Sequence, residues 1–308
     1  GNPQDAPAEI EFPATGWNLG TPDLTLGFPE PYFVADEVED LYQNITVQLS
    51  EEQLPATEWI KAIEFNPGSD VVHHIIGYSA TEGDVGQLSE DGSEEGMDVS
   101  GRTMLGGNAP GTEHADYPEG FGIELEPKSF ITFAMHYHKE SGPGTGVYDD
   151  SEIGFKFADE PVTHPVDISN VQHGSMEIPP LVSNWRVGGS HTFSEDTWLL
   201  SVMPHMHLRG KAASYIAFYP DGSSEVLLEV PAYDFNWQTQ YEFAEMKKLP
   251  AGTRLQMELI FDNSAEKGAA IGFNPNRSVR FGGPTTDEMD LAWFTVAPVE
   301  PVNMSANA

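Results

Sequence analysis

The chain has 308 residues, which is room for about two domains of ordinary size. It carries 14 Lys and Arg residues against 49 Asp and Glu residues, and the resulting formal net charge of −35 excludes a nucleic-acid binder and argues against docking on an anionic membrane. The absence of cysteine excludes disulfide scaffolds, Cys-based zinc sites, iron–sulfur clusters and thiol nucleophiles.

Short runs of apolar, β-branched and aromatic residues follow one another, bounded by Gly, Pro, Asp and Asn, and such runs predict strands. In chain order the predicted strands are Ile45–Leu49, Val71–Tyr78, Phe130–Tyr137, Thr197–Val202, Ser214–Tyr219, Glu225–Val230, Arg254–Phe261 and Leu291–Val296. Pro220-Asp221-Gly222 predicts a hairpin between two of them, and Leu249–Thr253 predicts a further turn. Many short strands at this spacing favour an all-β fold of antiparallel sandwiches.

Three other segments complete the pattern. The one predicted helix is short, around Ser50–Leu54. Glu82–Glu119 is a Gly- and acid-rich connection of a length that is usually functional or mobile. Asp159–Pro180 is punctuated by Pro and lacks periodicity, so we place the domain boundary near residue 165, giving domains 1–165 and 166–308. No stretch approaches the roughly 20 apolar residues of a membrane span, and residues 1–10 are not a signal peptide.

Six of the ten histidines form three pairs within or beside predicted strands. The pairs are His73-His74, His136-Tyr137-His138 and His205-Met206-His207. A single such histidine is more often structural than a ligand, but three pairs without any Cys favour a metal site. Imidazole-rich sites suit Cu, Zn, Fe and Ni, and an added Met thioether shifts the preference towards copper. The isolated histidines are expected in surface or loop roles: His114, His164, His173 and His191.

Strand geometry decides which of these pairs can share an ion. Residues i and i+2 of a strand lie on one face, so His205 and His207 can converge on one metal. His73 and His74 would point to opposite faces of a regular strand. They can reach one metal only if the backbone twists or the strand ends there.

Other catalytic patterns are poorly represented. The sequence contains no Gly-x-Ser-x-Gly nucleophile motif and no phosphate-binding Gly-rich loop. Paired catalytic carboxylates cannot be selected among the 49 acidic residues.

Four motifs, taken in order, carry a resemblance to a known family. They are His73-His74, His136-Tyr137, His205-Met206-His207 ahead of Gly210, and Met289 within Asp287-Glu288-Met289. From about Gly16-Trp17 to the strand after Met289, the chain resembles the copper type II, ascorbate-dependent monooxygenases, which include peptidylglycine α-hydroxylating monooxygenase and dopamine β-monooxygenase. It looks most similar to their bacterial, exported relatives.

The resemblance implies two copper ions, one on each domain. The implied ligands are His73, His74 and His136 at the first site, which delivers electrons, and His205, His207 and Met289 at the second, catalytic site, where O₂ is activated. His138 shares a face with His136 and is the second choice for the first site. Without the resemblance, Met289 would be interpreted as an ordinary core methionine.

The resemblance further implies two jelly-roll-like β-sandwich domains that face each other across a cleft. It implies a secreted, periplasmic or cell-surface monomer whose signal segment is absent from this chain. The expected reaction hydroxylates a C–H bond of a small organic substrate with O₂ and ascorbate or another one-electron donor, with a separate redox partner left open. A non-catalytic copper-binding or storage protein of the same fold is the alternative. A structural, adhesive β-sandwich protein with incidental His pairs is the third reading.

Three positions depart from the family pattern. Peptide-amidating members hold a peptide carboxylate with an Arg, an Asn and a Tyr where this chain has Met203, Leu291 and Trp293. A buried carboxylate without such partners would be costly. We therefore expect glycine-extended peptides to be poor substrates.

Overall fold

The computed structural model describes residues 13–81, 93–95, 101–109 and 114–302. These residues are built almost entirely from strands, which confirms the all-β prediction. The helix α1 (Ala265–Ile271) is the one helix among them, and it begins at Ser264, whose side chain accepts a hydrogen bond from the Lys267 N–H. The helix predicted around Ser50–Leu54 is wrong: this segment is a turn, in which the N–H groups of Gln53 and Leu54 both donate to the Ser50 carbonyl.

The N-terminal part of the chain forms two larger sheets and a two-stranded ribbon. The first sheet has the order β1 (Leu24–Gly27), β12 (Glu152–Phe157), β4 (Glu58–Asn66), β9 (Phe121–Leu125) and β13 (His164–Pro165), with β8 (Ala115–Asp116) also on β4. The second has the order β6 (Ser93–Glu95), β3 (Asp40–Gln48), β10 (Phe130–His138), β5 (Val72–Ala80) and β7 (Thr103–Asn108). The ribbon pairs β2 (Tyr32–Val34) with β11 (Val147–Asp149).

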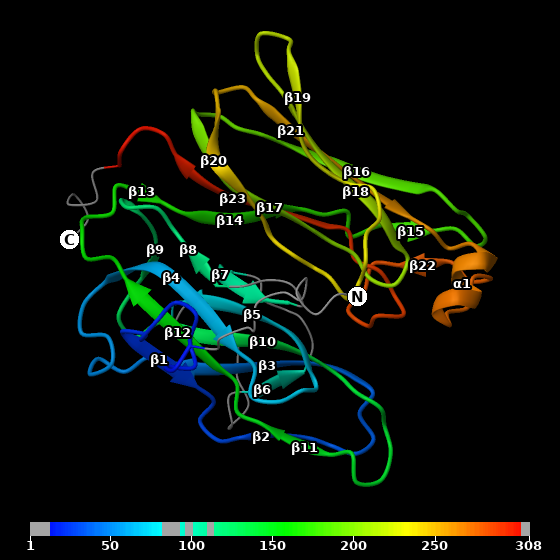
Figure 1. The fold of residues 1–308 in the computed structure, drawn as a ribbon, viewed down its shortest axis with the longest axis horizontal. Helices are drawn as coiled ribbons and strands as arrows, with labels where there is room; N and C mark the ends of the chain where they lie inside the picture. Colours follow the sequence, from blue (N-terminus) through cyan, green and yellow to red (C-terminus); the bar gives the residue numbers. More distant parts are fainter. Residues whose placement is uncertain (1–12, 82–92, 96–100, 110–113, 303–308) are drawn as a thin grey trace, which may run out of the picture.

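The C-terminal part repeats this plan with fewer strands. One sheet has the order β14 (Asp167–Val171), β23 (Leu291–Pro298), β17 (Thr197–His205) and β20 (Tyr241–Leu249). The other has the order β16 (Trp185–Thr192), β21 (Arg254–Phe261), β18 (Gly210–Phe218) and β19 (Ser224–Val230). A ribbon pairs β15 (Glu177–Ile178) with β22 (Val279–Arg280). In Figure 1 the N-terminal sheets occupy the lower part of the molecule and the C-terminal sheets the upper part.

Alternating burial along the strands explains where the cores lie. Along β21 intermediate and buried residues alternate strictly, as expected for a strand with one face on a core. One hydrophobic cluster takes side chains from both N-terminal sheets, including Ile63 of β4 and Phe133 of β10. A second cluster takes Leu199 of β17 and Leu255 of β21 from the two C-terminal sheets. Each of these clusters therefore takes side chains from two sheets.

The chain passes from the N-terminal to the C-terminal sheets at Val166. Strand β13 pairs with β9, whereas β14 pairs with β23. Leu200 and Ala297 of the C-terminal sheets belong to the N-terminal hydrophobic cluster, so the two parts also pack on each other. The division into domains 1–165 and 166–308 stays a prediction.

Both predicted turns are confirmed. Gly222, with φ 86°, closes the hairpin between β18 and β19, and Gly252, with φ 87°, lies between β20 and β21. Positive φ is the conformation that glycine adopts without steric cost. The second turn does not close a hairpin, because β20 pairs with β17 and β21 pairs with β18 and β16, so it carries the chain from one sheet to the other.

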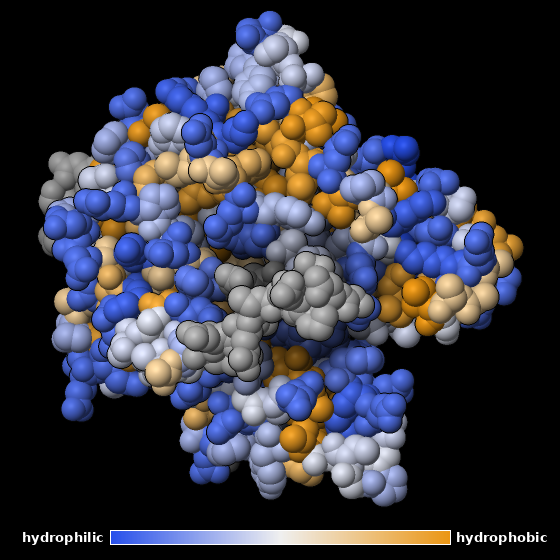
Figure 2. All heavy atoms as spheres, viewed as in Figure 1, coloured by the Kyte–Doolittle hydropathy of each residue, from blue (hydrophilic) through white to orange (hydrophobic). Residues whose placement is uncertain are grey.

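The surface is mainly hydrophilic. Figure 2 shows hydrophilic residues over most of one face, with hydrophobic residues gathered in patches over the C-terminal sheets and near α1. No helix within the described ranges has the length and apolar character needed to cross a bilayer.

Candidate metal centre

A β-bulge brings His73 and His74 to the same place. In the pairing of β10 with β5, His136 lies opposite His74 and Tyr137 lies opposite Val72, so His73 is an extra residue in its strand. A bulge bends the strand and re-aims one side chain. The Nδ1 atoms of His73 and His74 lie 3.2 Å apart. The backbone irregularity that the adjacent pair requires is therefore present.

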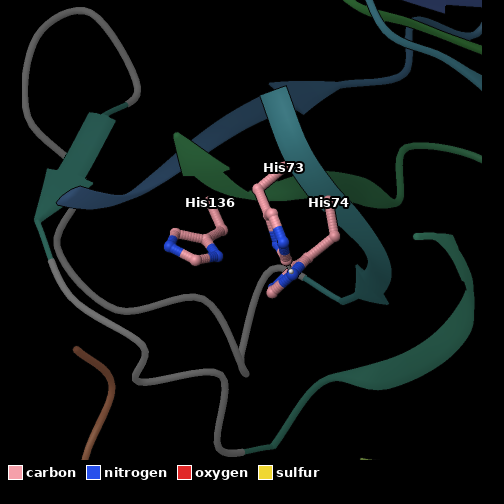
Figure 3. A group of neighbouring side chains, drawn as sticks. All are labelled: His73, His74 and His136. Carbon is pink, nitrogen blue, oxygen red and sulfur yellow. Dashed lines mark hydrogen bonds between the residues drawn. The ribbon is translucent and has the colours of Figure 1, made fainter. Parts of the chain in front are cut away.

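His136 completes a group of three imidazoles. Its side chain is fully buried, and the ligand atoms of His73, His74 and His136 all lie within 4.8 Å of one another. Figure 3 shows the first two rings extending from β5 next to each other, with the His136 ring from β10 beside them. Two nitrogens bonded to one ion at about 2.0 Å are about 3.3 Å apart at a tetrahedral angle, so the 3.2 Å separation suits a shared ion.

The partners of His136 determine which of its nitrogens is available. Nε2 lies 2.5 Å from Oδ1 of Asp40, to which it donates, and the Tyr42 ring stacks on the imidazole at 4.2 Å between centroids. Nδ1 is buried and has no hydrogen-bond partner among the described residues. A buried nitrogen left without a partner is costly unless something binds it. A metal ion between the three histidines would satisfy it.

His138, the second choice for this site, lies outside the group. Its side chain is 50% exposed and its Nδ1 lies 3.9 Å from Asp40 Oδ1. Its ring centroid is 6.4 Å from that of His73, so it remains a neighbour of the three-histidine group.

His205 is oriented by an amide side chain. It ends β17, it is buried, and its Nδ1 lies 2.7 Å from Oε1 of Gln238. The Gln238 amide nitrogen in turn donates to the Phe235 carbonyl at 2.8 Å, which fixes the amide so that its oxygen accepts from His205. Nε2 of His205 is therefore the nitrogen left to bind a metal.

His207 is oriented in the same way by the segment that carries Met289. Its Nδ1 lies 3.4 Å from the Asp287 carbonyl, and its backbone N–H donates to Glu288 at 2.8 Å. Nε2 is buried and has no hydrogen-bond partner in the part of the chain that the structure describes. Outer partners that fix the tautomer and the ring orientation are typical of metal-binding histidines.

Glu288 holds the turn after His207. Its fully buried carboxylate accepts from the backbone N–H groups of His207 at 2.8 Å and Arg209 at 2.6 Å, and the Arg209 side chain lies 3.9 Å away. Burial raises the pKa of Glu288 to about 8, although these donors oppose the shift. The carboxyl thus ties the segment before β23 to the end of β17.

Met289 is buried next to the second pair of histidines. In the pairing of β17 with β23, His205 lies opposite Leu291, and extending this register by two residues sets Met289 opposite His207. Met289 is 4% exposed and lines the same cavity as His74 and His205. His205 and Met289 therefore line one cavity, and His207 adjoins it through its ring contact with His205.

The two histidine groups lie in contact with each other. The rings of His74 and His205 are 5.9 Å apart between centroids. Phe235 stacks on His73 at 4.7 Å and lies edge-on to His207 at 6.0 Å. The ring contacts therefore link five histidines and one phenylalanine, so the two sites expected on facing domains form one cluster at the junction of the two parts.

Burial favours the neutral form of four of these histidines, which is the form that binds metals. Burial lowers the pKa of His73 and of His205 to about 4. Burial also holds the pKa of His74 and of His207 well below the usual value, and the neighbouring histidines add to the shift. These four imidazoles are therefore deprotonated near pH 7 when no metal is bound.

A cavity of about 560 Å³ opens beside the cluster. Its lining includes His74, His205 and Met289, together with apolar residues of both parts of the chain. The three residues that depart from the peptide-amidating pattern also line it: Met203, Leu291 and Trp293. Arg102 contributes a guanidinium group, whose Nη1 donates to Thr132 at 3.1 Å.

Other histidines lie away from the cluster. His164 binds the Pro298 carbonyl at 2.9 Å and stacks on Phe121. His191 packs against Phe193 and Phe294. His114 lines a separate cavity of about 320 Å³.

Sequence reasoning missed the residues that orient the ligands. These are Asp40, Phe235, Gln238 and Glu288, which reach the cluster from four different segments. Glu288 alone carried a signal, since it adjoins Met289 in a motif already noted. The others are ordinary polar or aromatic residues in sequence, and only the fold brings them to the histidines.

Comparisons with known proteins do not identify a family. No family model and no curated protein matches the chain. Among solved structures it is similar to the cowpea mosaic virus top component, a naturally occurring empty particle, at 7% identity over 92% of both chains with a TM-score of 0.38. It is also similar to PNGase F, a glycosylasparaginase from Flavobacterium meningosepticum, at 9% identity over 91% of this chain and 98% of that chain with a TM-score of 0.34. These scores are too low to support a conclusion about function.

Proposed function

We propose that the chain is a dicopper monooxygenase that hydroxylates a C–H bond of a small organic substrate, using O₂ and ascorbate or a similar one-electron donor. The observation that carries the proposal is the group of five neighbouring imidazoles, three of which have one ring nitrogen held by an acceptor. His73, His74 and His136 would hold one ion, and His205, His207 and Met289 the other. The resemblance of the four motifs points to the same chemistry.

The donor set supports copper as the metal. Imidazoles suit Cu, Zn, Fe and Ni, and neither set of proposed ligands contains a carboxylate of the kind that Mg or Ca prefers. The Met289 thioether in the second set favours Cu(I) over Zn there. Two bound copper ions would each pass one electron from the donor, so that the substrate, O₂, two electrons and two protons give an alcohol and water.

The protein's own residues would orient the ligands and hold the substrate. Asp40 and Gln238 fix the rings of His136 and His205 before any ion arrives. The cavity beside Met289 would bind the substrate with its reacting carbon at the cluster, between the apolar residues and the amide groups that line it. As part of this proposal, each part of the chain is a jelly-roll-like sandwich, and the cavity is the cleft between them.

Copper content and oxygen consumption test the proposal. We expect two copper ions retained per chain, and O₂ consumption that requires both ascorbate and a substrate. The Met289→Ile variant should lose at least about 10-fold in turnover, since it removes a ligand of the second ion only. Met176→Ile is a matched control, because Met176 is also 4% exposed but packs in a hydrophobic cluster without Met289 and does not line the cavity. A single copper per chain, or normal turnover by Met289→Ile, would overturn the proposal.

The same measurements separate the enzyme from a copper-storage protein. A storage protein would bind both ions but would consume no additional O₂ when substrates are added. A panel of amines, phenethyl compounds and glycine-extended peptides covers the candidate substrates. We expect the peptides to react poorly, because Met203 and Leu291 have no side-chain donor for a carboxylate and Trp293 has only its single indole N–H, without the charge of an Arg.

A further inference from the structure

One carboxylate contacts both the first group of histidines and the C-terminal part of the chain. Asp40 begins β3, and its Oδ1 accepts from Nε2 of His136 at 2.5 Å. Its Oδ2 accepts from the backbone N–H of Thr285 at 3.0 Å and from the Thr285 hydroxyl at 3.2 Å. Asp40 and Thr285 are 245 positions apart in the chain, and they belong to different parts of the molecule.

The Oδ1 contact determines the direction of His136. With its proton on Nε2 and held by Asp40, His136 presents Nδ1 to His73 and His74. The stacked Tyr42 ring limits rotation of the imidazole out of this plane. Loss of the carboxylate would leave His136 free to take the other tautomer or another rotamer.

The Oδ2 contact determines the position of the segment that carries Met289. This segment is held at Thr285 by Asp40 and at Glu288 by the backbone N–H groups of His207 and Arg209. Met289 follows directly. The segment is thus anchored to the N-terminal part at one point and to the turn of His207 three residues later.

We propose that Asp40 is a positioning residue for both ligand sets at once, aligning His136 with one oxygen and the Met289 segment with the other. The inference rests on the proposed function only in taking these residues as copper ligands. A carboxylate that merely orients one histidine would need one of its two oxygens, whereas here the second oxygen accepts two bonds from the opposite part of the chain.

Asp40→Asn tests the proposal because it keeps the size of the side chain but leaves one acceptor oxygen for two sets of donors. The measurement is Cu(I) affinity by chelator competition, made separately for each ligand set. To measure the first set alone, His205 and His207 are replaced by Ala. To measure the second set alone, His73 and His74 are replaced by Ala. We expect Asp40→Asn to lower the Cu(I) affinity of the first set by about 10- to 100-fold and that of the second set by several-fold. Copper X-ray absorption should also show a weakened sulfur contribution from Met289.

Thr285→Val separates the two contacts. It removes the hydroxyl bond to Oδ2 while leaving the Oδ1 bond to His136 intact. The variant should lower the affinity of the second set more than that of the first. It also keeps the proposal testable if Asp40→Asn fails to fold. Asp36→Asn is the control, because the Asp36 carboxylate accepts from Gly144 and Gly146 rather than from the cluster, so both affinities should be unchanged.

Each outcome is decisive. If Asp40→Asn weakens the first set alone and Thr285→Val changes neither, Asp40 serves only His136 and the proposal is wrong. If both variants behave as expected but no substrate supports O₂ consumption, the positioning role stands and the monooxygenase function fails. If the unaltered chain binds no Cu(I), both fail together.

Discussion

Every imidazole has two ring nitrogens, and the neighbour that binds one of them decides which is left for a metal. In this cluster the neighbours are of three chemical kinds: a carboxylate at His136, an amide oxygen at His205 and a backbone carbonyl at His207. All three are acceptors, so each fixes the proton on the bonded nitrogen. The opposite nitrogen is therefore left with its lone pair towards the cluster.

Removing one such acceptor should weaken one site without affecting the fold. Gln238→Leu deletes the oxygen that accepts from His205 Nδ1, and we expect Cu(I) affinity at the second set to fall by about 10- to 100-fold. Chelator competition measures the change. Gln240→Leu is the control, since Gln240 lines the same cavity and no hydrogen bond from its side chain to these histidines is found in the described structure. Equal affinities for the two variants would contradict the assignment of Gln238.

A second residue-scale prediction concerns a buried acid behind the first site. Asp149 is fully buried and accepts from the hydroxyls of Tyr137 and Ser151, and burial raises its pKa above the ordinary 3.8. A raised pKa in the folded state means that the acid favours folding below pH 3.8 and that this contribution is lost as the pH rises through the raised value. Asp149→Asn has no such loss, because its amide stays neutral while keeping an acceptor for Tyr137.

The stability of Asp149→Asn relative to the unaltered chain should therefore increase between about pH 4 and pH 7. Urea unfolding at both values measures the difference. Asp221→Asn provides the opposite case, because Ser223 lowers the pKa of Asp221 at an exposed turn, so its stability relative to the unaltered chain should increase only as the pH falls below 3.8. If the difference in unfolding free energy between Asp149→Asn and the unaltered chain does not change with pH, burial does not destabilise the ionised carboxyl of Asp149.

At the scale of elements, strand β5 delivers two of the ligands and has little room to move. Its Gly77 lies against Phe65 of β4, so that a Cβ added there would be 2.6 Å from the Phe65 ring. Gly77→Ala should therefore cost about 1–3 kcal/mol through overpacking, and it should weaken Cu(I) binding by displacing the start of β5. Denaturant unfolding gives the cost. Gly174→Ala, at a position where an added Cβ has no atom within 4 Å, should change neither the stability nor the Cu(I) affinity. If Gly77→Ala leaves the free energy of unfolding unchanged, the two sheets move apart at little cost.

How far the sequence predicts the elements depends on how the strands are buried. The predicted runs Phe130–Tyr137 and Arg254–Phe261 match β10 and β21 closely, because apolar residues mark at least one face of each. Strand β16 was missed, since it is exposed at six of eight positions and contains two glycines. Strand β4 was missed because charged residues interrupt its apolar positions. Its hydrogen bonds come from neighbours that are distant in the chain, and sequence periodicity does not report them.

The candidate site likewise has residues that the sequence predicts and contacts that it does not. Its proposed ligands were predictable because histidine pairs are rare and because their spacing determines which face of a strand they share. The sequence indicated that the backbone must twist or the strand must end at His73 and His74, but the bulge that the structure has instead depends on the pairing of β5 with β10. The contact between the two ligand groups was not anticipated, because it depends on how two sets of sheets pack and on the Phe235 ring between them.

At the scale of the whole molecule, the net charge of −35 acts against folding by self-repulsion. The screening length falls from about 30 Å at 0.01 M salt to about 10 Å at 0.1 M. The melting temperature should therefore rise by several degrees over this range of NaCl, as calorimetry would show. A neutral solute at equal osmolarity should raise it less. If salt has no effect, the acidic residues are spaced widely enough, or paired well enough, that their repulsion is negligible.

Strand β23 is tied to the N-terminal part by hydrogen bonds near both of its ends. Before its first residue Thr285 is held by Asp40, and at its last residue the Pro298 carbonyl is held by His164. The eight residues of β23 between Thr285 and the end of the strand span about 25 Å. The polypeptide itself crosses between the two parts beside His164, so that end cannot come apart. Any separation of the parts would pivot there like a hinge, and breaking the Asp40 contact would open the cavity from the end at the histidine cluster.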